Sequence, residues 1–500
     1  MKFSNKDLCS LLFSELSPGK STCNSCKKIY KEGRGYTNQM HHLLKKHPDY
    51  LQLAEAAFRK GNRLGLSLPD QRTNEIFRWI EWCVVERMPK YIHLLYGYVR
   101  DVIAAKLPDR FVIVLDGWTS GGRHFVVILA VYNDPSGADP AQRNPNYDES
   151  IQCLSRRFVL LAFCPFGDEE NLGAQSLYDL IADTLATFNK PWSSVLFMVG
   201  DNCSVNQSIG RKAGALPFIG CASHRFQLAV NDFLSDDDAL LAKIHALMKH
   251  LSKIKCRAAL RKVTPLAPVM RNATRWSSTF AMLERYDKLH PVLLTLDHAT
   301  VTKRGIAKVL LSEEEEAARA NALHQILKEL NEVTKALQDS TLTLVGARRA
   351  FDLVASKYPR MADRLASDAP VVNNPDLERG IVKIILGSRL NAREQAACAP
   401  FKSSDGDAAT DQTSRSFLAS AFKKTHKSRA PVYMPLEWVP PTSNECERFF
   451  SQAKLVYSDL RKSMDPDTLE VLMFLSFNKD WWDATSVQAV RQNMRRELRE

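Results

Sequence analysis

The strongest constraint on the fold of this chain is a group of four residues near its start. Cys23 and Cys26 form a C-x2-C pair, and His42 and His47 follow at a spacing that one helix can present together. Two thiolates and two imidazoles in this order can close a tetrahedral shell around zinc. His41 is an alternative to His42 as a ligand, and a chance C-x2-C pair beside a histidine-rich helix is the competing interpretation. We expect a structural Zn²⁺ site here.

The charge of the chain is concentrated around these residues. The 500 residues include 68 Lys+Arg and 56 Asp+Glu, which gives a net charge of +12. Residues 1–60 contain eleven basic and five acidic residues, so half of the excess lies in this short stretch. A unit of this size needs a metal to fold, because its apolar core is too small. A basic, metal-stabilised unit favours a polyanionic partner such as nucleic acid.

Composition excludes several other classes of protein. With 45% apolar and 25% charged residues, the chain is expected to be globular and long enough for two to four domains. The sequence has no apolar run of about 18 residues and no secretory signal pattern, so we expect no membrane partner and a place inside the cell. Eleven cysteines without such a signal favour reduced core residues over disulfides.

Residues 12–50 resemble a BED-type zinc finger, with Phe13 before the cysteine pair and an H-L-x3-H ending at 42–47. The resemblance implies that the partner is double-stranded DNA and that the histidine-bearing helix lies in the major groove. It implicates three residues of that helix as DNA contacts, namely Asn38, Gln39 and Lys45. Lys27 and Lys28 are expected to contact phosphates, which adds affinity without sequence information.

The next part of the chain is predicted to change from helices to a sheet. Residues 61–110 have helical periodicity, and the paired Trp79 and Trp82 are interpreted as core residues. Strands are predicted at 111–116, 125–132 and 157–164, with Gly121-Gly122 as a hairpin turn between the first two. Two more strands are predicted at 195–200 and 218–221, with helices at 175–188, 206–213 and from 225. Three antiparallel strands followed by two parallel ones, in the order βββαβαβα, predict a ribonuclease H-like core in an α+β, multidomain chain.

Two aspartates are predicted to lie at the ends of neighbouring central strands. Asp116 interrupts the apolar run of the first strand, and Asp201 closes the fourth strand. Either aspartate alone is more typical of a turn. Together they repel each other unless protonated or bridged by cations, and such oxygen ligands suit Mg²⁺ or Mn²⁺ in phosphodiester chemistry. A site of this kind needs a third acid.

The candidate for the third acid is Glu447. We expect a helix there that is capped by Thr442 or Ser443, with Glu445 at capping-box distance from Thr442. The competing interpretation of Glu447 is an exposed glutamate favoured by the helix dipole. The residues alone leave both interpretations open.

Five motifs, in order, are similar to those of the hAT family of DNA transposases. They are D-G-W-T-S at 116–120, G-D-N-C-S-V-N at 200–206, the C-x2-H pair Cys221 and His224, T-R-W at 274–276 and T-S-N-E-C-E-R-F-F-S-Q-A at 442–453. The resemblance implies that Asp116, Asp201 and Glu447 are catalytic and hold Mg²⁺ or Mn²⁺. Cys221 is interpreted as a core residue.

The same resemblance implies three DNA contacts near the acids. His224 is expected to donate a hydrogen bond near the scissile phosphate, and Arg275 is expected to hold phosphate. Trp276 is expected to stack on a displaced base, where stacking contributes about 1–3 kcal/mol. The alternative for Trp276 is a core anchor for the helix that carries Met282 and Leu283.

The motifs also suggest how the chain is divided. We expect a zinc finger at 1–60, a helical linker or dimerisation-like region at 61–110, the first part of the core at 111–289, an all-helical insertion domain at 290–400, a flexible linker at 401–430, the end of the core with a dimerisation region at 431–482, and a C-terminal helix at 483–500. In the insertion, Ser312 and Glu315 suggest a capping box. The apolar stretch 469–482 must be covered by a second subunit or by the chain itself, and the resemblance favours at least a dimer.

The sequence therefore predicts a cut-and-paste DNA transposase of the nucleus that binds element ends and target DNA. The alternative is a catalytically silent, transposase-derived DNA-binding or regulatory protein in which the ribonuclease H-like body serves as a scaffold. A metal nuclease acting on RNA is a third interpretation, which the DNA-binding type of finger disfavours.

Overall fold

The computed structural model of the protein describes residues 3–17, 19–31, 36–61, 89–137, 148–165, 173–212, 216–272, 275–311, 314–403, 432–457 and 464–497. The chain forms two compact units, Met1–Lys90 and Tyr91–Glu500. Several predictions lie outside the described residues. They concern Trp79 and Trp82, the capping box at Ser312, and nearly all of the linker expected at 401–430.

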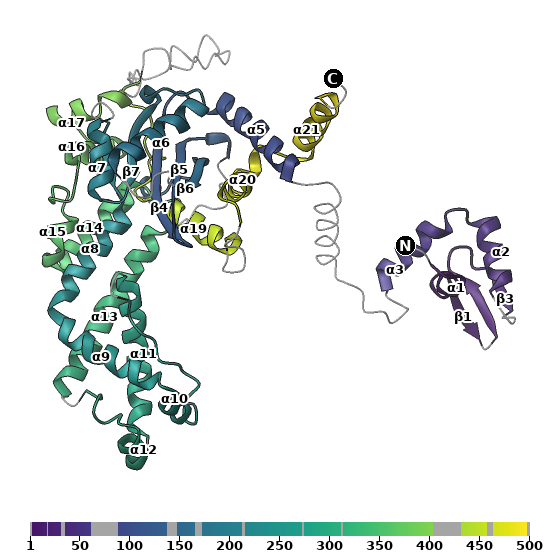
Figure 1. The fold of residues 1–500 in the computed structure, drawn as a ribbon, viewed down its shortest axis with the longest axis horizontal. Helices are drawn as coiled ribbons and strands as arrows, with labels where there is room; N and C mark the ends of the chain where they lie inside the picture. The colour runs from purple at the N-terminus through teal and green to yellow at the C-terminus, as the bar shows by residue number, and fades with distance from the viewer. Residues whose placement is uncertain are drawn as a thin grey trace, which may run out of the picture. The chain divides into compact units, whose positions relative to one another are not determined.

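The described residues of the first unit up to Gly61 form a three-stranded antiparallel sheet and three helices, coloured purple in Figure 1. Its elements are α1 (Asn5–Leu12), β1 (Phe13–Ser17), β2 (Lys20–Cys23), β3 (Ile29–Lys31), α2 (Thr37–Lys46) and α3 (Tyr50–Gly61). Ser4 and Asp7 form a capping box at the start of α1. The core is small and includes Leu11, Phe13 and Leu43. A core of this size is consistent with a unit that needs a metal for stability.

The second unit contains a five-stranded mixed sheet. Its strands are β4 (Phe111–Ser120), β5 (Arg123–Asn133), β6 (Arg156–Pro165), β7 (Val195–Gly200) and β8 (Phe218–Gly220), in the spatial order β6-β5-β4-β7-β8. The pairs β4–β5 and β5–β6 are antiparallel, whereas β4–β7 and β7–β8 are parallel. Helix α6 (Ala174–Thr187) precedes β7, α7 (Ser204–Lys212) precedes β8, and α8 (Ala222–Leu234) follows it. The predicted order of strands and helices is confirmed.

One detail of the predicted sheet is wrong, because Asp116 lies within a strand and not at its end. Strand β4 continues past Asp116 to Ser120, since the Gly121-Gly122 turn lets Asp116 pair with Val127 and Ser120 pair with Arg123. The pairing of Val114 with Val199 places Asp116 opposite Asp201 two residues later. The two aspartates are therefore neighbours across the parallel pair.

Helices from both ends of the unit pack on this sheet. They are α5 (Pro89–Lys106), α19 (Asn444–Val456) and α20 (Pro466–Phe477), and α21 (Ala484–Glu497) follows them. Phe449 of α19 packs against Phe163 of β6 with ring centroids 4.8 Å apart, and Phe474 of α20 lies 4.7 Å from Tyr96 of α5. The apolar residues of α20 are thus buried within the same chain. For the apolar stretch 469–482, this corresponds to covering by the chain itself and not by a second subunit.

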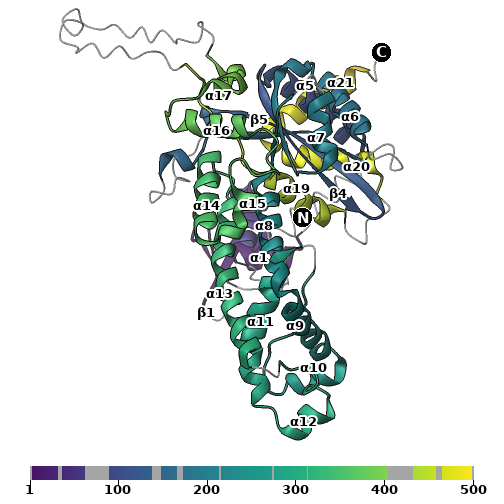
Figure 2. The ribbon, with the colours of Figure 1, turned by 90° about the vertical axis from the view of Figure 1, so that its left-hand side faces the viewer.

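The remaining helices form a body with a second apolar core. Besides α8, they are α9 (Asp238–Leu251), α10 (Ile254–Leu260), α11 (Trp276–Leu294), α12 (His298–Lys303), α13 (Glu314–Leu337), α14 (Leu344–Lys357) and α15 (Ala362–Leu365). In Figure 2, α9, α11 and α13 run side by side. Helix α11 continues across residues 289 and 290, where we expected a domain boundary. Helices α16 (Pro375–Ile385) and α17 (Ala392–Ala397) follow and pack near the sheet.

Arg156, at the start of β6, connects the helical body to the segment before α19. Its guanidinium donates hydrogen bonds to five carbonyl oxygens, those of Ser340, Leu342, Glu437, Trp438 and Val439. Three of these precede α19, and two follow α13. One side chain therefore fixes where α19 begins relative to the sheet.

Among the described residues, no helix is long and apolar enough to cross a bilayer.

Candidate functional site

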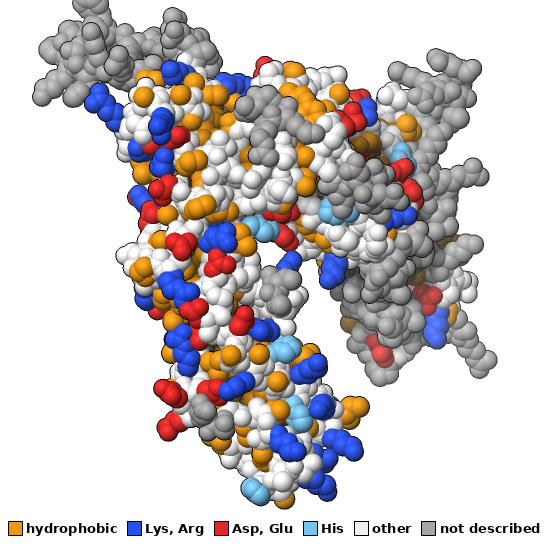
Figure 3. Space-filling model, turned by 60° about the vertical axis from the view of Figure 1, so that its left-hand side comes forward, with side chains coloured by type: hydrophobic (Ala, Val, Ile, Leu, Met, Phe, Trp, Pro, Cys, Tyr) orange, Lys and Arg blue, Asp and Glu red, His pale blue; other side chains and the backbone are white. Residues whose placement is uncertain are grey.

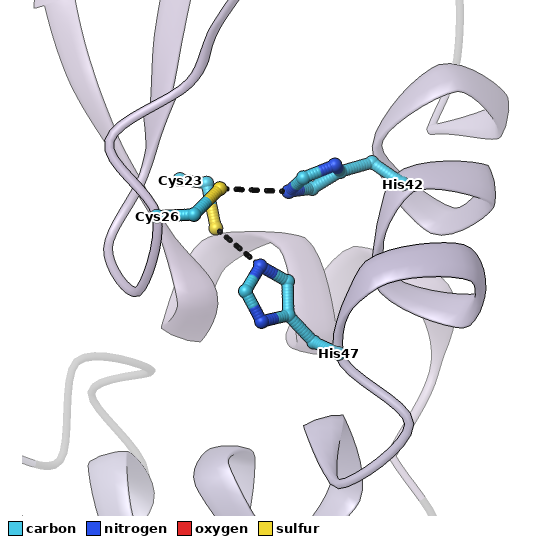
Figure 4. A group of neighbouring side chains, drawn as sticks. All are labelled: Cys23, Cys26, His42 and His47. Carbon is cyan, nitrogen blue, oxygen red and sulfur yellow. Dashed lines mark hydrogen bonds between the residues drawn. The ribbon is translucent and has the colours of Figure 1, made fainter.

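The four residues predicted to bind zinc converge in the first unit. Cys23 ends β2, Cys26 lies in the turn that follows, and His42 and His47 lie on and directly after α2. Figure 4 shows their side chains pointing toward one another, and their ligand atoms all lie within 4.8 Å. His41 is exposed, so the alternative of His41 as a ligand is wrong, because the turn of α2 directs His42 inward.

The distances in this group match zinc coordination. A tetrahedral ion with Zn–S of about 2.3 Å and Zn–N of about 2.0–2.1 Å places sulfur and nitrogen about 3.5 Å apart. The Sγ of Cys26 lies 3.3 Å from Nε2 of His42, and the Sγ of Cys23 lies 3.6 Å from Nε2 of His47. The Lys28 N–H and the His47 ring lower the pKa of Cys26 to about 7, and burial lowers the pKa of His42. Both shifts favour the deprotonated forms that bind zinc.

The residues predicted to contact DNA differ in how free their side chains are. Asn38 and Lys45 are exposed on α2, and Lys27 and Lys28 are exposed beside the cysteine pair. The Gln39 amide instead donates a 2.7 Å hydrogen bond to the Ser21 hydroxyl. Gln39 therefore holds α2 to β2 in this conformation, whereas the other four side chains are available to a partner.

A second group of possible ligands lies at the sheet of the larger unit. Ligand atoms of Asp116 on β4, His224 on α8 and Glu447 on α19 all lie within 4.8 Å of one another. The Nδ1 atom of His224 is buried and has no hydrogen-bond partner in the described part of the chain. Asp116 and Glu447 are far apart in the sequence, so only the fold brings them together.

Asp201 lies beside this group without joining it. Asp201 and Asp116 line the same cavity of about 220 Å³. One Asp201 carboxylate oxygen accepts hydrogen bonds from the Asn206 side-chain amide and from the Cys203 N–H. Asp201 is therefore close enough to act on Asp116 electrostatically, but its carboxylate is already partly satisfied.

The charges in this group influence one another. The pKa of Asp116 is raised to about 6, mainly by burial and less by the carboxylates of Glu447 and Asp201, against the opposing effects of His224 and the Gly117 N–H. The Cys221 thiol and the charges of Asp116 and Asp201 raise the pKa of His224 to about 9 against the effect of burial. A pKa of about 9 keeps His224 protonated near neutral pH, so its ring is a hydrogen-bond donor, and the oxygens of the two carboxylates are the ligands that suit a divalent cation.

The start of α19 differs from the predicted capping box. Ser443 is the N-cap residue, but its side chain makes no capping hydrogen bond and instead donates to Oδ2 of Asp116 at 3.4 Å. Glu445 pairs with Arg448, not with the start of the helix. The expected capping box is therefore absent, because Ser443 contacts Asp116 of the sheet and Glu445 pairs with Arg448 one turn later in the same helix.

Two residues that flank Glu447 were missed by sequence reasoning. The Asn444 amide donates 2.8 Å hydrogen bonds to the Ser223 hydroxyl and the Leu337 carbonyl. Arg448 donates to the Gln338 carbonyl at 2.9 Å. Both tie α19 to the end of α13, and no spacing in the sequence signals these contacts.

A cavity of about 680 Å³ opens beside Glu447 and His224, and Arg275, Trp276 and Arg448 are among its lining residues. Trp276 is 2% exposed and packs near Phe226 in the helical core. Its position corresponds to the packing alternative, and stacking on a base would require the ring to move. Cys221 is fully buried, as expected for a core residue.

The described part of the first unit is thus a small three-stranded sheet with helices, organised around a Cys2His2 zinc site. Residues 12–48 match the family model of the BED zinc finger. This match indicates DNA binding by that part of the chain. No curated protein matches the chain.

Proposed function

We propose that this protein is a metal-dependent DNA transposase of the cut-and-paste type, similar to the hAT family, with a ribonuclease H-like catalytic core. The observation that carries the proposal is the convergence of Asp116, His224 and Glu447 from three elements, with ligand atoms within 4.8 Å. The order and pairing of the five strands support the same core, and the BED finger supports DNA as the substrate.

The donor set fits a catalytic Mg²⁺ or Mn²⁺. Asp116 and Glu447 would hold the ion, with Asp201 next to Asp116, and the protonated ring of His224 would donate a hydrogen bond to phosphate. The buried Nδ1 atom of His224, which has no hydrogen-bond partner among the described residues, supports this role for the ring, since such an atom is costly unless it finds a partner. A bound divalent cation would activate the attacking oxygen and stabilise the leaving oxygen of a phosphodiester.

Other residues of the chain would position the DNA and the acids. Arg275 and Arg448 bring positive charge to the cavity beside Glu447, where phosphate would lie. Asn444 and Arg156 would act as positioning residues, because they fix α19 and hence Glu447. In this proposal the finger binds element DNA, two or more subunits act together, and the protein works in the nucleus.

The test is nicking of a supercoiled plasmid by the full-length protein in Mn²⁺. Asp116→Asn and Glu447→Gln should each reduce nicking by at least about 100-fold, because each removes a metal ligand. The matched control is Asp183→Asn, which changes an exposed aspartate on α6 and should nick normally. Binding to duplex DNA should be unchanged in all three variants. Undiminished nicking by Asp116→Asn would rule out the proposal.

One observation favours the silent DNA-binding protein as a second candidate. The Asp201 carboxylate is held by Asn206 and lies outside the group of atoms within 4.8 Å. If the chain has only two acids and an imidazole at the site, it could bind DNA without cleaving it. In that case the wild-type protein would bind duplex DNA but would not nick the plasmid in Mn²⁺ or Mg²⁺.

A further inference from the structure

The far part of the helical body has an unusual charge. Residues 239–272 contain eight Lys or Arg and no Asp or Glu, and residues 298–311 contain three Lys or Arg and no acid. These residues form most of α9, all of α10 and α12, and the turns that follow them. Figure 3 shows the basic side chains gathered at the lower end of the helical body. We call this surface the basic tip.

The segments of the basic tip belong to one packed structure. The Arg304 carbonyl, just after α12, lies 2.7 Å from Nε2 of His250 on α9 and accepts a contact from the Cys256 thiol on α10 at 3.6 Å. Ile306 is buried in the core beneath them. The three helices therefore hold their cations on a common surface.

Most cations of the basic tip are exposed and make no salt bridge within the described residues. This applies to Lys249, Lys253, Lys255, Arg261, Lys262, Lys303 and Lys308. Nearby cations that have an acid within reach do pair, as Lys243 does with Glu316 and Arg271 with Asp238. Seven unpaired like charges repel one another and so contribute nothing to folding. A surface with this charge suits an anionic partner.

We propose that the basic tip is a second DNA-binding surface, which holds the phosphate backbone of duplex DNA independently of its sequence. Lysine suits this role, because it contacts phosphates as a point charge without reading base edges. DNA is favoured over an acidic protein because the BED finger already brings this chain to DNA, whose phosphates are then at high local concentration. The surface is separate from the acids at the sheet, and the proposal does not depend on catalysis.

The test is fluorescence anisotropy of the full-length protein on a mixed-sequence duplex of about 30 base pairs, titrated with salt and without divalent ions. The variant K255Q/R261Q/K262Q removes three exposed cations of the basic tip. The matched control K328Q/R389Q/R393Q removes three exposed cations elsewhere in the same unit, none of which makes a salt bridge in the described residues. Equal thermal unfolding temperatures and zinc contents would show that all three proteins are folded.

We expect the slope of log K against log salt to be less steep by about 3 in the tip variant, since each lost phosphate contact removes about 0.9 from its magnitude. The tip variant should also bind at least about tenfold more weakly at 0.1 M salt. The control variant should bind like the wild type. In a Cys26→Ser background, residual DNA binding should persist and then disappear when the tip changes are added. An unchanged slope for the tip variant would overturn the proposal and would leave an acidic protein as the partner to be tested. The assay contains no divalent ions and measures binding alone, so its result does not depend on whether the protein nicks DNA.

Discussion

Replacing Arg156 with methionine should destabilise the larger unit by about 3–5 kcal/mol. The guanidinium donates to five carbonyl oxygens at 2.6–3.1 Å, three of them in residues 437–439 and two in residues 340–342. Methionine keeps much of the apolar stem but none of the donors. Each carbonyl left buried without a partner costs about 1–3 kcal/mol, and water will reach some of them because Arg156 is partly exposed.

The effect should be local as well as global. Urea unfolding gives the total loss of stability, and hydrogen exchange of residues 437–457 shows whether α19 and the segment before it have loosened. Arg156→Lys keeps the charge but offers only three donors on a compact head, so it should lie between the wild type and Arg156→Met. A loss below about 1 kcal/mol for Arg156→Met, with unchanged exchange in residues 437–457, would refute the view that Arg156 fixes α19.

Two further predictions concern pH and zinc. Burial, followed by the charge of Asp467, raises the pKa of Glu470 from its ordinary value of 4.5 to about 7. The folded state therefore prefers the protonated carboxyl. The contribution of Glu470 to stability is fully present below about pH 4.5 and is lost as the pH rises through 7. Glu470→Gln should therefore raise the free energy of unfolding by about 3 kcal/mol at pH 8 and leave it nearly unchanged at pH 4.5. Equal gains at both pH values in urea titrations would contradict this. Metal analysis should find one zinc per chain in the wild type and none in Cys26→Ser. In that variant, residues 5–58 should lose protection from hydrogen exchange while the larger unit keeps its protection. Retained protection of residues 5–58 without zinc would count against a metal-dependent finger.

The parts of the fold that could be predicted are those with local signals. The β-branched runs at 111–115 and 195–200 are buried strands, because a short apolar run bounded by turn residues has few other ways to be buried. The zinc group was predictable because the ligand types and their spacing are dictated by the metal. The choice of His42 over His41 needed the structure, since adjacent helical residues differ only in the direction that they face.

The candidate site was less predictable because it depends on contacts between distant elements. The sequence pattern placed Asp116 at a strand end, whereas pairing with β5 extends the strand beyond it. Ser443 was expected to cap a helix, but its hydroxyl contacts Asp116 instead. The net charge of the whole chain conceals the basic tip, because acids elsewhere in the larger unit offset its cations, whereas a count over residues 239–272 alone reveals it.

The central claim is that Asp116 and Glu447 form one divalent-metal site, and Mn²⁺ binding to the zinc-loaded protein tests it most directly. Electron paramagnetic resonance of free Mn²⁺ gives the affinity without any need for a DNA substrate. The account predicts a site in the wild type and in Asp183→Asn, and affinities at least about 100-fold weaker in Asp116→Asn and Glu447→Gln. Equal Mn²⁺ binding by all four proteins would contradict it.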